Sequence, residues 1–247
     1  MNSFYGIYFF HGVSILPLLR IDFQKELDKF QSFFRNMILR RMLATQITDL
    51  RLAKKELRRA MKSKVAAISL EDKIKQSEQV TEKLVKSPSY INAQSIALYL
   101  HMNDEIQTEK ILQNALESGK TCFIPRYFMG TESLMEMVQI YDMKDYQNLP
   151  LTKWNIKQPP DTEKRPEALE KGSLDVMLLP GMAFSVKGQR LGRGKGYYDK
   201  YLTKAVNSGM KPVTIALAFD EQILPDIPCD DHDFILDAIL SPSIQTY

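Results

Sequence analysis

The chain has 247 residues, of which 44% are hydrophobic and 26% are charged, and its formal net charge is +3. This length and apolar content allow one large folded domain, and the small net charge argues against a globally basic nucleic-acid binder. Its two cysteines, Cys122 and Cys229, have neither the paired spacing of a zinc site nor the number that a disulfide framework needs. We therefore expect a reducing compartment.

The first 45 residues are interpreted as an amino-terminal extension, followed by one folded domain over 46–247. Residues 4–19 are apolar and aromatic, and apolar residues from 23 to 37 recur at the spacing of an amphipathic helix. The opening lacks the basic start and the cleavage site of a secretory signal, and it is too short for a membrane span. Residues 33–46 carry the arginines of a mitochondrial presequence, but Asp22, Glu26 and Asp28 precede them. We expect a cytoplasmic protein, or a mitochondrial one if the extension is a presequence.

From about Leu50, helices and strands are predicted to alternate, which is typical of an α/β protein. A basic helix covers 50–68, and Ser69 with Asp72 resembles a capping box that opens a second helix, ended by Ser87 and Pro88. Next come a strand at 95–100, a helix at 105–117 capped by Asn103 or Asp104, and strands at 121–127 and 134–141.

Residues 142–173 contain four prolines and predict a long loop that carries the single tryptophan, Trp154. Long ordered loops in compact domains are often functional. The continuous apolar run 174–180 predicts a strand buried on both faces. A helix over 197–208 and strands at 213–219 and 234–240 complete the predicted elements.

The segment 190–202, RLGRGKGYYDKYL, has glycine at alternate positions with Arg193 and Lys195 between them. A strand, a glycine-rich loop and a helix form a common phosphate-binding layout, because bare backbone amides and the helix N-terminus can approach an anion. The pattern is neither a P-loop nor a dinucleotide fingerprint, and a flexible basic hairpin is the alternative. Both cations suit phosphoryl transfer. Asp199, in the first turn of the helix, either binds Mg2+ beside the phosphates or stabilises the helix N-terminus.

The segment 228–234, PCDDHDF, supplies a second acidic group just before the last predicted strand. Four adjacent polar residues cannot all face one ion, so one or two of them bind a cation, or the segment is a solvated turn. We select Asp233, which lies nearest the strand, as the metal ligand. His232 is interpreted as a loop residue rather than a zinc ligand.

The glycine motif follows LLPGMAF, and DEIQTEKIL, CFIPRY, KWNIKQP and ALAF occur in the expected order. In these motifs the chain resembles the 5-formyltetrahydrofolate cyclo-ligase family, from about Leu52 to about Leu240. The resemblance implies an α/β fold, a three-layer α/β/α single domain with a mixed, mainly parallel sheet, and makes 46–247 the catalytic domain. It implies the ATP-dependent cyclisation of 5-formyltetrahydrofolate to 5,10-methenyltetrahydrofolate, with release of ADP and phosphate and with Mg2+ as cofactor.

The resemblance also assigns residues by position. The ATP contacts are Lys54, Arg58, Arg190, Leu191, Gly192, Arg193, Gly194, Lys195, Gly196, Tyr197 and Tyr198, and the catalytic cations among them are Lys54, Arg58, Arg193 and Lys195. The folate contacts are Leu100, Glu105, Tyr127, Trp154, Arg193, Gly194, Lys195, Gly196 and Tyr197, and Arg126 lines the same cleft. The metal ligands are Asp199 and Asp233. Without the resemblance, Lys54 and Arg58 would belong to a solvated basic helix, Leu100 to the core, and Trp154 to a loop.

The expected partners are ATP and 5-formyltetrahydrofolate, with or without a polyglutamate tail. We expect no nucleic-acid or membrane partner and a monomeric state. The main alternative is a catalytically silent relative that binds nucleotide or RNA. Tyrosines stacking on bases beside the basic loop would give salt-sensitive nucleic-acid binding without turnover. A sugar-phosphate isomerase on a similar fold would act without ATP.

Overall fold

A computed structural model of the chain describes residues 35, 48–128, 134–152, 156–230 and 233–246. The predictions for most of the amino-terminal extension, for Trp154 and for His232 fall outside these residues, as does the predicted boundary at residue 45. The chain divides into two compact units, Met1–Asp49 and Leu50–Tyr247, and the elements below belong to the second. Within the described residues no helix has the length and apolar character needed to cross a membrane.

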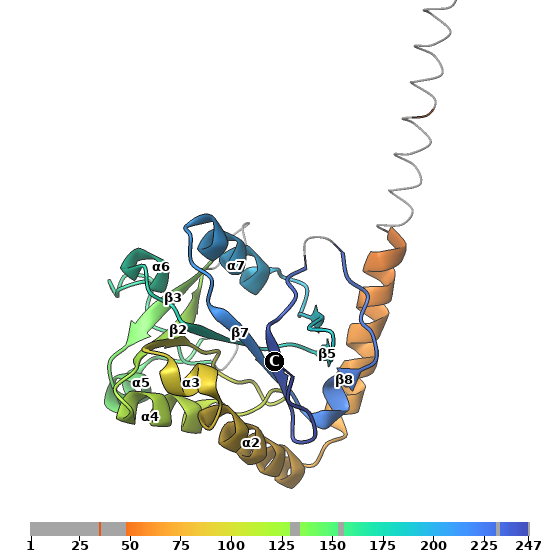
Figure 1. Cartoon of the computed structure of the whole chain (residues 1–247), viewed down its shortest axis with the longest axis horizontal. Helices are drawn as coiled ribbons and strands as arrows, with labels where there is room; N and C mark the ends of the chain where they lie inside the picture. The colour runs from red at the N-terminus through yellow and green to blue at the C-terminus, as the bar shows by residue number, and fades with distance from the viewer. Residues whose placement is uncertain (1–34, 36–47, 129–133, 153–155, 231–232, 247) are drawn as a thin grey trace, which may run out of the picture. The chain divides into compact units, whose positions relative to one another are not determined.

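The described part of the second unit is built on a six-stranded sheet with the order β3-β2-β1-β4-β7-β9 (Figure 1). The strands are β1 (Ser95–Ala97), β2 (Thr121–Tyr127), β3 (Met135–Ile140), β4 (Val176–Leu179), β7 (Val213–Leu217) and β9 (Ala238–Leu240). Neighbouring strands are parallel except for β3, which pairs antiparallel with β2 at the sheet edge. The predicted mixed, mainly parallel sheet is confirmed.

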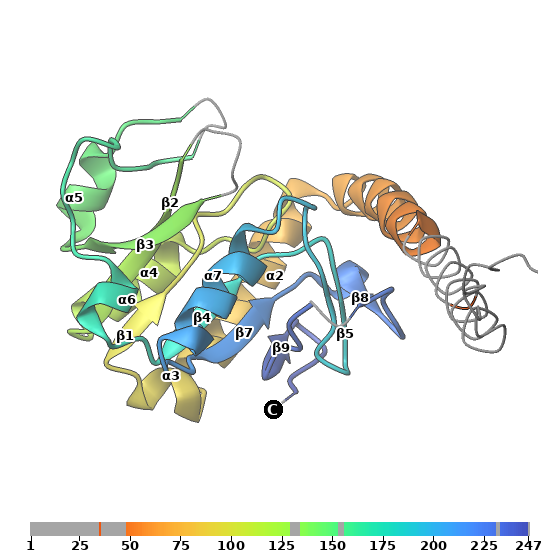
Figure 2. The same ribbon diagram turned by 90° about the horizontal axis from the view of Figure 1, so that it is seen from above.

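Helices cover both faces of this sheet (Figure 1). One face carries α2 (Leu70–Val85), α3 (Pro88–Asn92) and α4 (Glu109–Glu117), and the other carries α6 (Ala168–Lys171) and α7 (Tyr197–Asn207). Seen from above, α7 lies over β4 and β7, with α2 beyond them (Figure 2). The strands β1 and β4 are buried at every position because helices cover both of their sides. These three layers are the predicted α/β/α architecture.

Local signals account for several helix boundaries. Ser69 caps α2 as predicted, because its hydroxyl oxygen accepts a hydrogen bond from the Asp72 amide. The predicted caps of α4 are wrong, since this helix begins after Thr108 rather than at 105. Thr108 instead donates its hydroxyl to the Tyr99 carbonyl at 2.6 Å, which holds the preceding residues in a non-helical turn. That turn brings Glu105 to the pocket described below.

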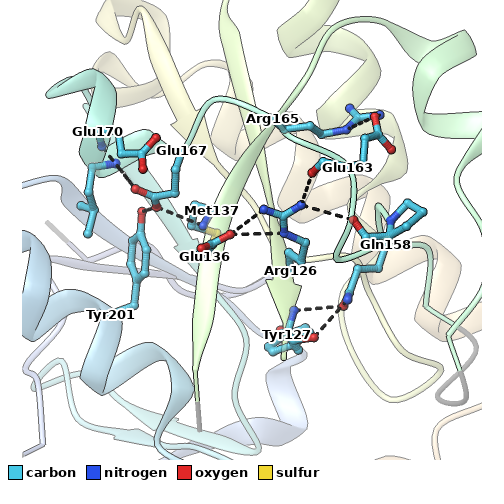
Figure 3. Close-up of polar contacts among 12 residues, drawn as sticks. Arg126, Tyr127, Glu136, Met137, Gln158, Glu163, Arg165, Glu167, Glu170 and Tyr201 are labelled. Carbon is cyan, nitrogen blue, oxygen red and sulfur yellow. Dashed lines mark hydrogen bonds and ion pairs between the residues drawn. The ribbon is translucent and has the colours of Figure 1, made fainter. Parts of the chain in front are cut away.

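The predicted loop 142–173 contains two short helices, so its description as a continuous loop is wrong. Asp142 caps α5 (Met143–Asn148), and Glu167 caps α6 through the amides of Leu169 and Glu170. Both helices fit the prolines, because α5 ends before Pro150 and α6 begins after Pro166. Glu167 also accepts a hydrogen bond of 2.6 Å from the Tyr201 hydroxyl, which ties α6 to α7 (Figure 3).

A second small sheet, which the sequence did not predict, has the order β6-β5-β8. Its strands are β5 (Ala183–Ser185), β6 (Arg190–Leu191) and β8 (Ile223–Leu224), and η1 (Asp220–Gln222) precedes β8. Strands of two or three residues are too short to show a hydrophobic period. This sheet matters because β6 leads directly into the glycine-rich loop.

The strand order reverses between β1 and β4. From β1 the chain continues to β2 on one side, whereas β4, β7 and β9 follow on the other. In α/β sheets such a reversal leaves a crevice outside the carboxyl ends of the two strands, where the following loops diverge.

Candidate active site

A pocket of about 500 Å³ is lined by the segments that follow β1 and β4. Six other segments complete its wall: the helical residues 50–66, the end of β2, the segment at Ile156, β6 with the glycine-rich loop, the start of α7, and Asp233. The lining residues are Lys54, Arg58, Tyr99, Leu100, Met102, Glu105, Tyr127, Ile156, Pro180, Gly181, Arg190, Leu191, Gly192, Arg193, Gly194, Lys195, Gly196, Tyr197, Tyr198, Asp199 and Asp233. Apart from Arg126, every predicted site residue that the structure describes therefore lines one pocket, and Trp154 lies outside the described residues.

The glycine-rich loop has the predicted position between a strand and a helix. It leaves β6 and ends at the N-terminus of α7, with Gly194 at φ +90° and Gly196 at φ +69°. Residues other than glycine rarely adopt such positive φ angles, because their Cβ clashes with the backbone. Arg58 packs against this loop, because its Nε donates to the Gly192 carbonyl at 2.8 Å. Burial lowers the pKa of Arg58, and the nearby Asp233 carboxylate opposes this effect.

The two cations inside the glycine motif differ in their environment. Lys195 is exposed, and no other described residue forms an ion pair or hydrogen bond with its side chain. Arg193 instead pairs with two carboxylates: its Nη2 lies 2.6 Å from Asp104 and 2.9 Å from Glu105. Burial lowers the pKa of Arg193, but these two carboxylates outweigh it and raise the pKa above its usual range. Arg193 is therefore the loop cation that contacts Glu105, a predicted folate contact.

Glu105 is a buried carboxylate, and its side chain is only 5% exposed. It accepts hydrogen bonds from Arg193 and from the Met102 amide. Burial raises the pKa of Glu105, while the charge of Arg193 and the Met102 amide oppose that rise. Arg193 therefore favours the ionised form of Glu105, which burial alone would tend to neutralise.

Arg190 and Asp199 form a partly buried contact between β6 and α7. The Arg190 Nη2 lies 2.6 Å from Asp199 Oδ1, and Nη1 donates to the Pro180 carbonyl at 3.2 Å. Arg190 therefore connects the loop after β4 to the first turn of α7. The second oxygen of Asp199 accepts no hydrogen bond from the described residues.

Asp233 pairs with Lys54 across the pocket. The Lys54 Nζ lies 2.5 Å from Asp233 Oδ2 and 2.9 Å from Asp230 Oδ2. Burial lowers the pKa of Lys54, but hydrogen bonds and attraction from Asp233 and Asp230 raise it overall. Asp233 Oδ1, like Asp199 Oδ2, accepts no hydrogen bond from the described residues.

These carboxylates determine which metal the pocket can hold. Among the described residues no three His, Cys, Asp or Glu side chains gather closely enough to bind a metal by themselves. Mg2+ does not need such a cage, because proteins hold it through one or two carboxylates together with substrate phosphates and water. Two pocket aspartates, each with an available oxygen, fit that donor set.

Tyr127, Tyr197 and Tyr198 form an aromatic part of the wall. The Tyr127 and Tyr198 hydroxyls lie 3.1 Å apart, and the Tyr127 ring meets the Tyr197 ring edge-on with 4.9 Å between centroids. Burial raises the pKa of both Tyr127 and Tyr198, so these hydroxyls stay neutral. Such faces suit a flat aromatic ligand.

Sequence reasoning misplaced one cleft residue and did not assign five others. Arg126 does not line the pocket, because β2 directs its side chain toward Glu136 and the loop carbonyls of Pro160 and Glu163. The structure adds Tyr99, Met102, Ile156, Pro180 and Gly181. Pro180 and Gly181 directly follow the most apolar predicted strand, and the rule that ligands bind beyond strand carboxyl ends could have identified them.

The fold and pocket define an α/β protein with a glycine-rich, cation-lined crevice at the reversal of its strand order, a site suited to phosphorylated ligands. The model of the 5-formyltetrahydrofolate cyclo-ligase family matches residues 51–242. The chain belongs to this family.

Named relatives agree with this assignment. A Mus musculus 5-formyltetrahydrofolate cyclo-ligase is 44% identical over 189 residues, which cover 76% of this chain and 93% of the relative. A probable 5-formyltetrahydrofolate cyclo-ligase of Caenorhabditis elegans is 40% identical, over 76% of this chain and 91% of its own. The solved structure of Aquifex aeolicus 5,10-methenyltetrahydrofolate synthetase is 25% identical with a TM-score of 0.65, covering 78% of this chain and 92% of that one.

Proposed function

We propose that the protein catalyses the ATP-dependent cyclisation of 5-formyltetrahydrofolate to 5,10-methenyltetrahydrofolate, with release of ADP and phosphate. The observation that carries the proposal is the single pocket in which the glycine-rich loop, its cations and the folate-side residues meet. Family membership supports the same reaction. A site for either ligand alone would not need both sets of residues within one cavity of about 500 Å³.

The chemistry explains why a folate pocket must also bind ATP. A formamide oxygen is a poor leaving group, so N10 cannot close the ring by expelling it directly. In the proposed reaction the formyl oxygen attacks the γ-phosphorus of ATP and ADP leaves. N10 then adds to the activated formyl carbon and loses its proton, and phosphate departs with the former formyl oxygen. The methenyl bridge remains.

The cations of the pocket have the task of stabilising phosphoryl charge. Arg58 lies against the loop backbone, Lys195 extends from it, and Lys54 reaches the pocket from the helical residues 50–66. Backbone amides at the start of α7 add positive potential. We assign these groups to the triphosphate, and Arg193 to the junction between triphosphate and folate, because it already contacts Glu105.

Glu105 is the proposed acceptor for the pterin, because an ionised carboxylate can take two parallel hydrogen bonds from adjacent N–H groups. Leu100, Tyr127 and Tyr197 supply apolar and aromatic surface around the flat rings. Trp154 stays a predicted folate contact. Together these groups would hold N10 close to the formyl carbon. Substrate binding would then supply the loss of entropy that ring closure requires.

Asp199 and Asp233 are the proposed holders of Mg2+. Bound Mg2+ would neutralise triphosphate charge and orient the γ-phosphoryl group. The support is the chemistry of the two aspartates: both line the pocket, and one oxygen of each accepts no hydrogen bond from the described residues.

The test is a mixture of protein, MgATP and 5-formyltetrahydrofolate, followed by absorbance of the methenyl product and by release of ADP. Equal formation of both supports the proposal. A silent relative would bind ATP without producing the chromophore, an RNA-binding relative would bind RNA in a salt-sensitive way, and an isomerase would not consume ATP. Any of these results in place of turnover overturns the proposal.

We also propose that the protein acts as a monomer in the cytoplasm, on folate with or without a polyglutamate tail. An Arabidopsis thaliana relative, 29% identical over 77% of this chain, is named as mitochondrial. Sequencing the amino terminus of protein from its native cell distinguishes the two locations, since a presequence would have been removed. Sedimentation of the purified protein measures its oligomeric state.

A further inference from the structure

The end of β2 extends beyond its neighbour β1. The β1 strand pairs with Thr121, Cys122 and Phe123, whereas β3 pairs with β2 as far as Tyr127. Backbone groups of successive strand residues point to opposite sides, and the Phe128 amide donates to Leu134 on the β3 side. The amide and carbonyl of Tyr127 therefore face the side where β1 has already ended. Buried backbone groups of this kind need partners.

The side chain of Gln158 supplies both partners. The Tyr127 amide donates to Gln158 Oε1 at 3.0 Å, and Gln158 Nε2 donates to the Tyr127 carbonyl at 3.0 Å (Figure 3). A primary amide offers an acceptor and a donor side by side, as a residue of a neighbouring strand does. Gln158 is buried, with 9% exposure, so water does not readily replace these bonds. The glutamine thus completes the sheet at the pocket wall.

The neighbouring residue Arg126 holds the same loop from the other side of β2. Its Nη1 donates to the carbonyls of Glu163 at 2.6 Å and Pro160 at 3.4 Å (Figure 3). Its Nε and Nη2 donate to Glu136 on β3, which fixes the guanidinium in place. The residues from Gln158 to Glu163 are therefore bonded to β2 at two successive positions.

This clamp has a consequence for the pocket. Ile156 lies two residues before Gln158, and both Ile156 and Tyr127 line the pocket. The Tyr127 hydroxyl meets Tyr198 at the start of α7, so its position also depends on the backbone that Gln158 holds. Gln158 itself does not line the pocket. Its bonds determine how closely the Ile156 segment and Tyr127 approach each other.

We propose that Gln158 is a positioning residue that sets the folate-side wall by clamping the Ile156 segment to Tyr127. This inference rests on the proposed function, which places folate against Tyr127. It implies that loss of the clamp weakens folate binding selectively. The clamp reaches the predicted ATP contacts only through the packing of Tyr127 against Tyr197 and Tyr198. Lys195, Arg58 and Asp199 do not contact Gln158, so ATP binding is expected to change much less than folate binding.

The test compares Gln158→Met, which removes both hydrogen bonds at similar length, with Gln158→Glu, which keeps only the acceptor. The net contribution of each bond is about 0.5–1.5 kcal/mol. We expect Gln158→Met to raise KM for 5-formyltetrahydrofolate about tenfold, the equivalent of about 1.4 kcal/mol. KM for ATP should change less than about twofold, because a difference of that size is within the usual variation in the contribution of one hydrogen bond. Gln158→Glu should also raise KM for 5-formyltetrahydrofolate selectively. Its carboxylate has no hydrogen to donate to the Tyr127 carbonyl, so two acceptors would face each other.

Lys157→Met is the matched control in the same loop. Lys157 Nζ donates to the carbonyls of Tyr146 at 3.2 Å and Gln147 at 2.6 Å, and the residue does not line the pocket. This variant loses two backbone contacts of the loop but none to Tyr127, so both KM values should stay at the wild-type level. Urea unfolding of all variants separates a general loss of stability from a loss of wall geometry.

The inference is overturned if Gln158→Met leaves the folate KM unchanged, if it raises both KM values equally, or if Lys157→Met has the same effect. Should Gln158→Met fail to fold, the comparison of Gln158→Glu with Lys157→Met decides the question by the same criteria. Should wild-type protein form no methenyl product, the proposed function fails separately. Equilibrium binding of 5-formyltetrahydrofolate to wild type and variants then tests the clamp, and equal dissociation constants overturn it.

Discussion

Replacing Gly194 by alanine tests why the loop needs a bare backbone. A Cβ at this position would lie 3.3 Å from Arg58 Cζ and 3.5 Å from each of its Nη atoms, and φ is +90°. Gly196 provides the comparison in the same loop. Its φ is +69°, but apart from its chain neighbours no described residue would have an atom within 4 Å of a Cβ there. The two substitutions therefore share backbone strain, and only Gly194→Ala also presses on a predicted phosphate ligand.

The expected magnitudes follow from these contacts. A non-glycine residue in the left-handed region costs about 1–2 kcal/mol, which is the whole expected effect of Gly196→Ala on loop stability. At Gly194 the strain is about 1–3 kcal/mol, because φ lies farther from the favoured left-handed angles. Displacing Arg58 would also break its 2.8 Å bond to the Gly192 carbonyl. A bond from a charged donor contributes about 1.5–3 kcal/mol, so ATP affinity should fall at least about tenfold further in Gly194→Ala.

A double-mutant cycle with Arg58→Ala measures the part of this effect that passes through the arginine. ATP affinity is determined by calorimetry for wild type, both single variants and the double variant, and urea unfolding reports folding. If Gly194→Ala acts by displacing Arg58, it should lower ATP affinity less in the Arg58→Ala background than in wild type. Only the contribution of backbone strain at residue 194 should then remain. An effect of the same size in both backgrounds would refute the reasoning, as would equal ATP affinities of the two glycine variants.

Three further outcomes are expected. Lys195→Ala should lower turnover by about 10²–10³, the usual effect of removing one transition-state charge donor. Its urea unfolding should match wild type, because Lys195 is exposed and bonded to no other described residue; unchanged turnover would remove Lys195 from the mechanism. Asp199→Asn should raise the Mg2+ concentration needed for half-maximal rate, and identical metal titrations would refute its assignment as a ligand. Burial raises the pKa of Glu105 above its ordinary 4.5, so the folded protein binds the proton more tightly than the unfolded chain. Wild-type stability should therefore fall relative to Glu105→Gln as pH rises from 4.5 through that raised pKa, as urea unfolding at several pH values would show.

The sequence predicted the contiguous parts of the site best. The glycine-rich loop carries its backbone requirement, its cations and the helix start within a few residues, so one motif is sufficient to recognise it. The partner of Arg193 is different, because Glu105 lies 88 positions earlier in the chain. Only the strand order, which places the segments after β1 and β4 together, makes these residues neighbours.

The folate-side wall shows a second limit of sequence reasoning. Prolines between 150 and 166 indicated an irregular segment, but they do not reveal which of its polar side chains replaces a missing strand. Gln158 has that role because β1 ends four positions before the level of Tyr127, a fact of register that no local pattern contains. Arg126 was assigned to the cleft by the resemblance together with its neighbour Tyr127, but the alternation along β2 turns the two side chains to opposite sides.

The cations of the glycine-rich segment differ in whether they must break an ion pair with a carboxylate in order to bind phosphate. Arg190 is paired with Asp199, whose side chain is 30% exposed, and Arg193 with the buried Glu105, so a phosphate that recruits either cation competes with a carboxylate. Leaving the buried Glu105 unpaired is strongly unfavourable. Lys195 has no such partner among the described residues and can meet a phosphate without breaking a pair. The paired arginines are therefore suited to holding Asp199 and Glu105 in place, whereas Lys195 is the loop cation best suited to follow charge as it develops on the transferred phosphoryl group.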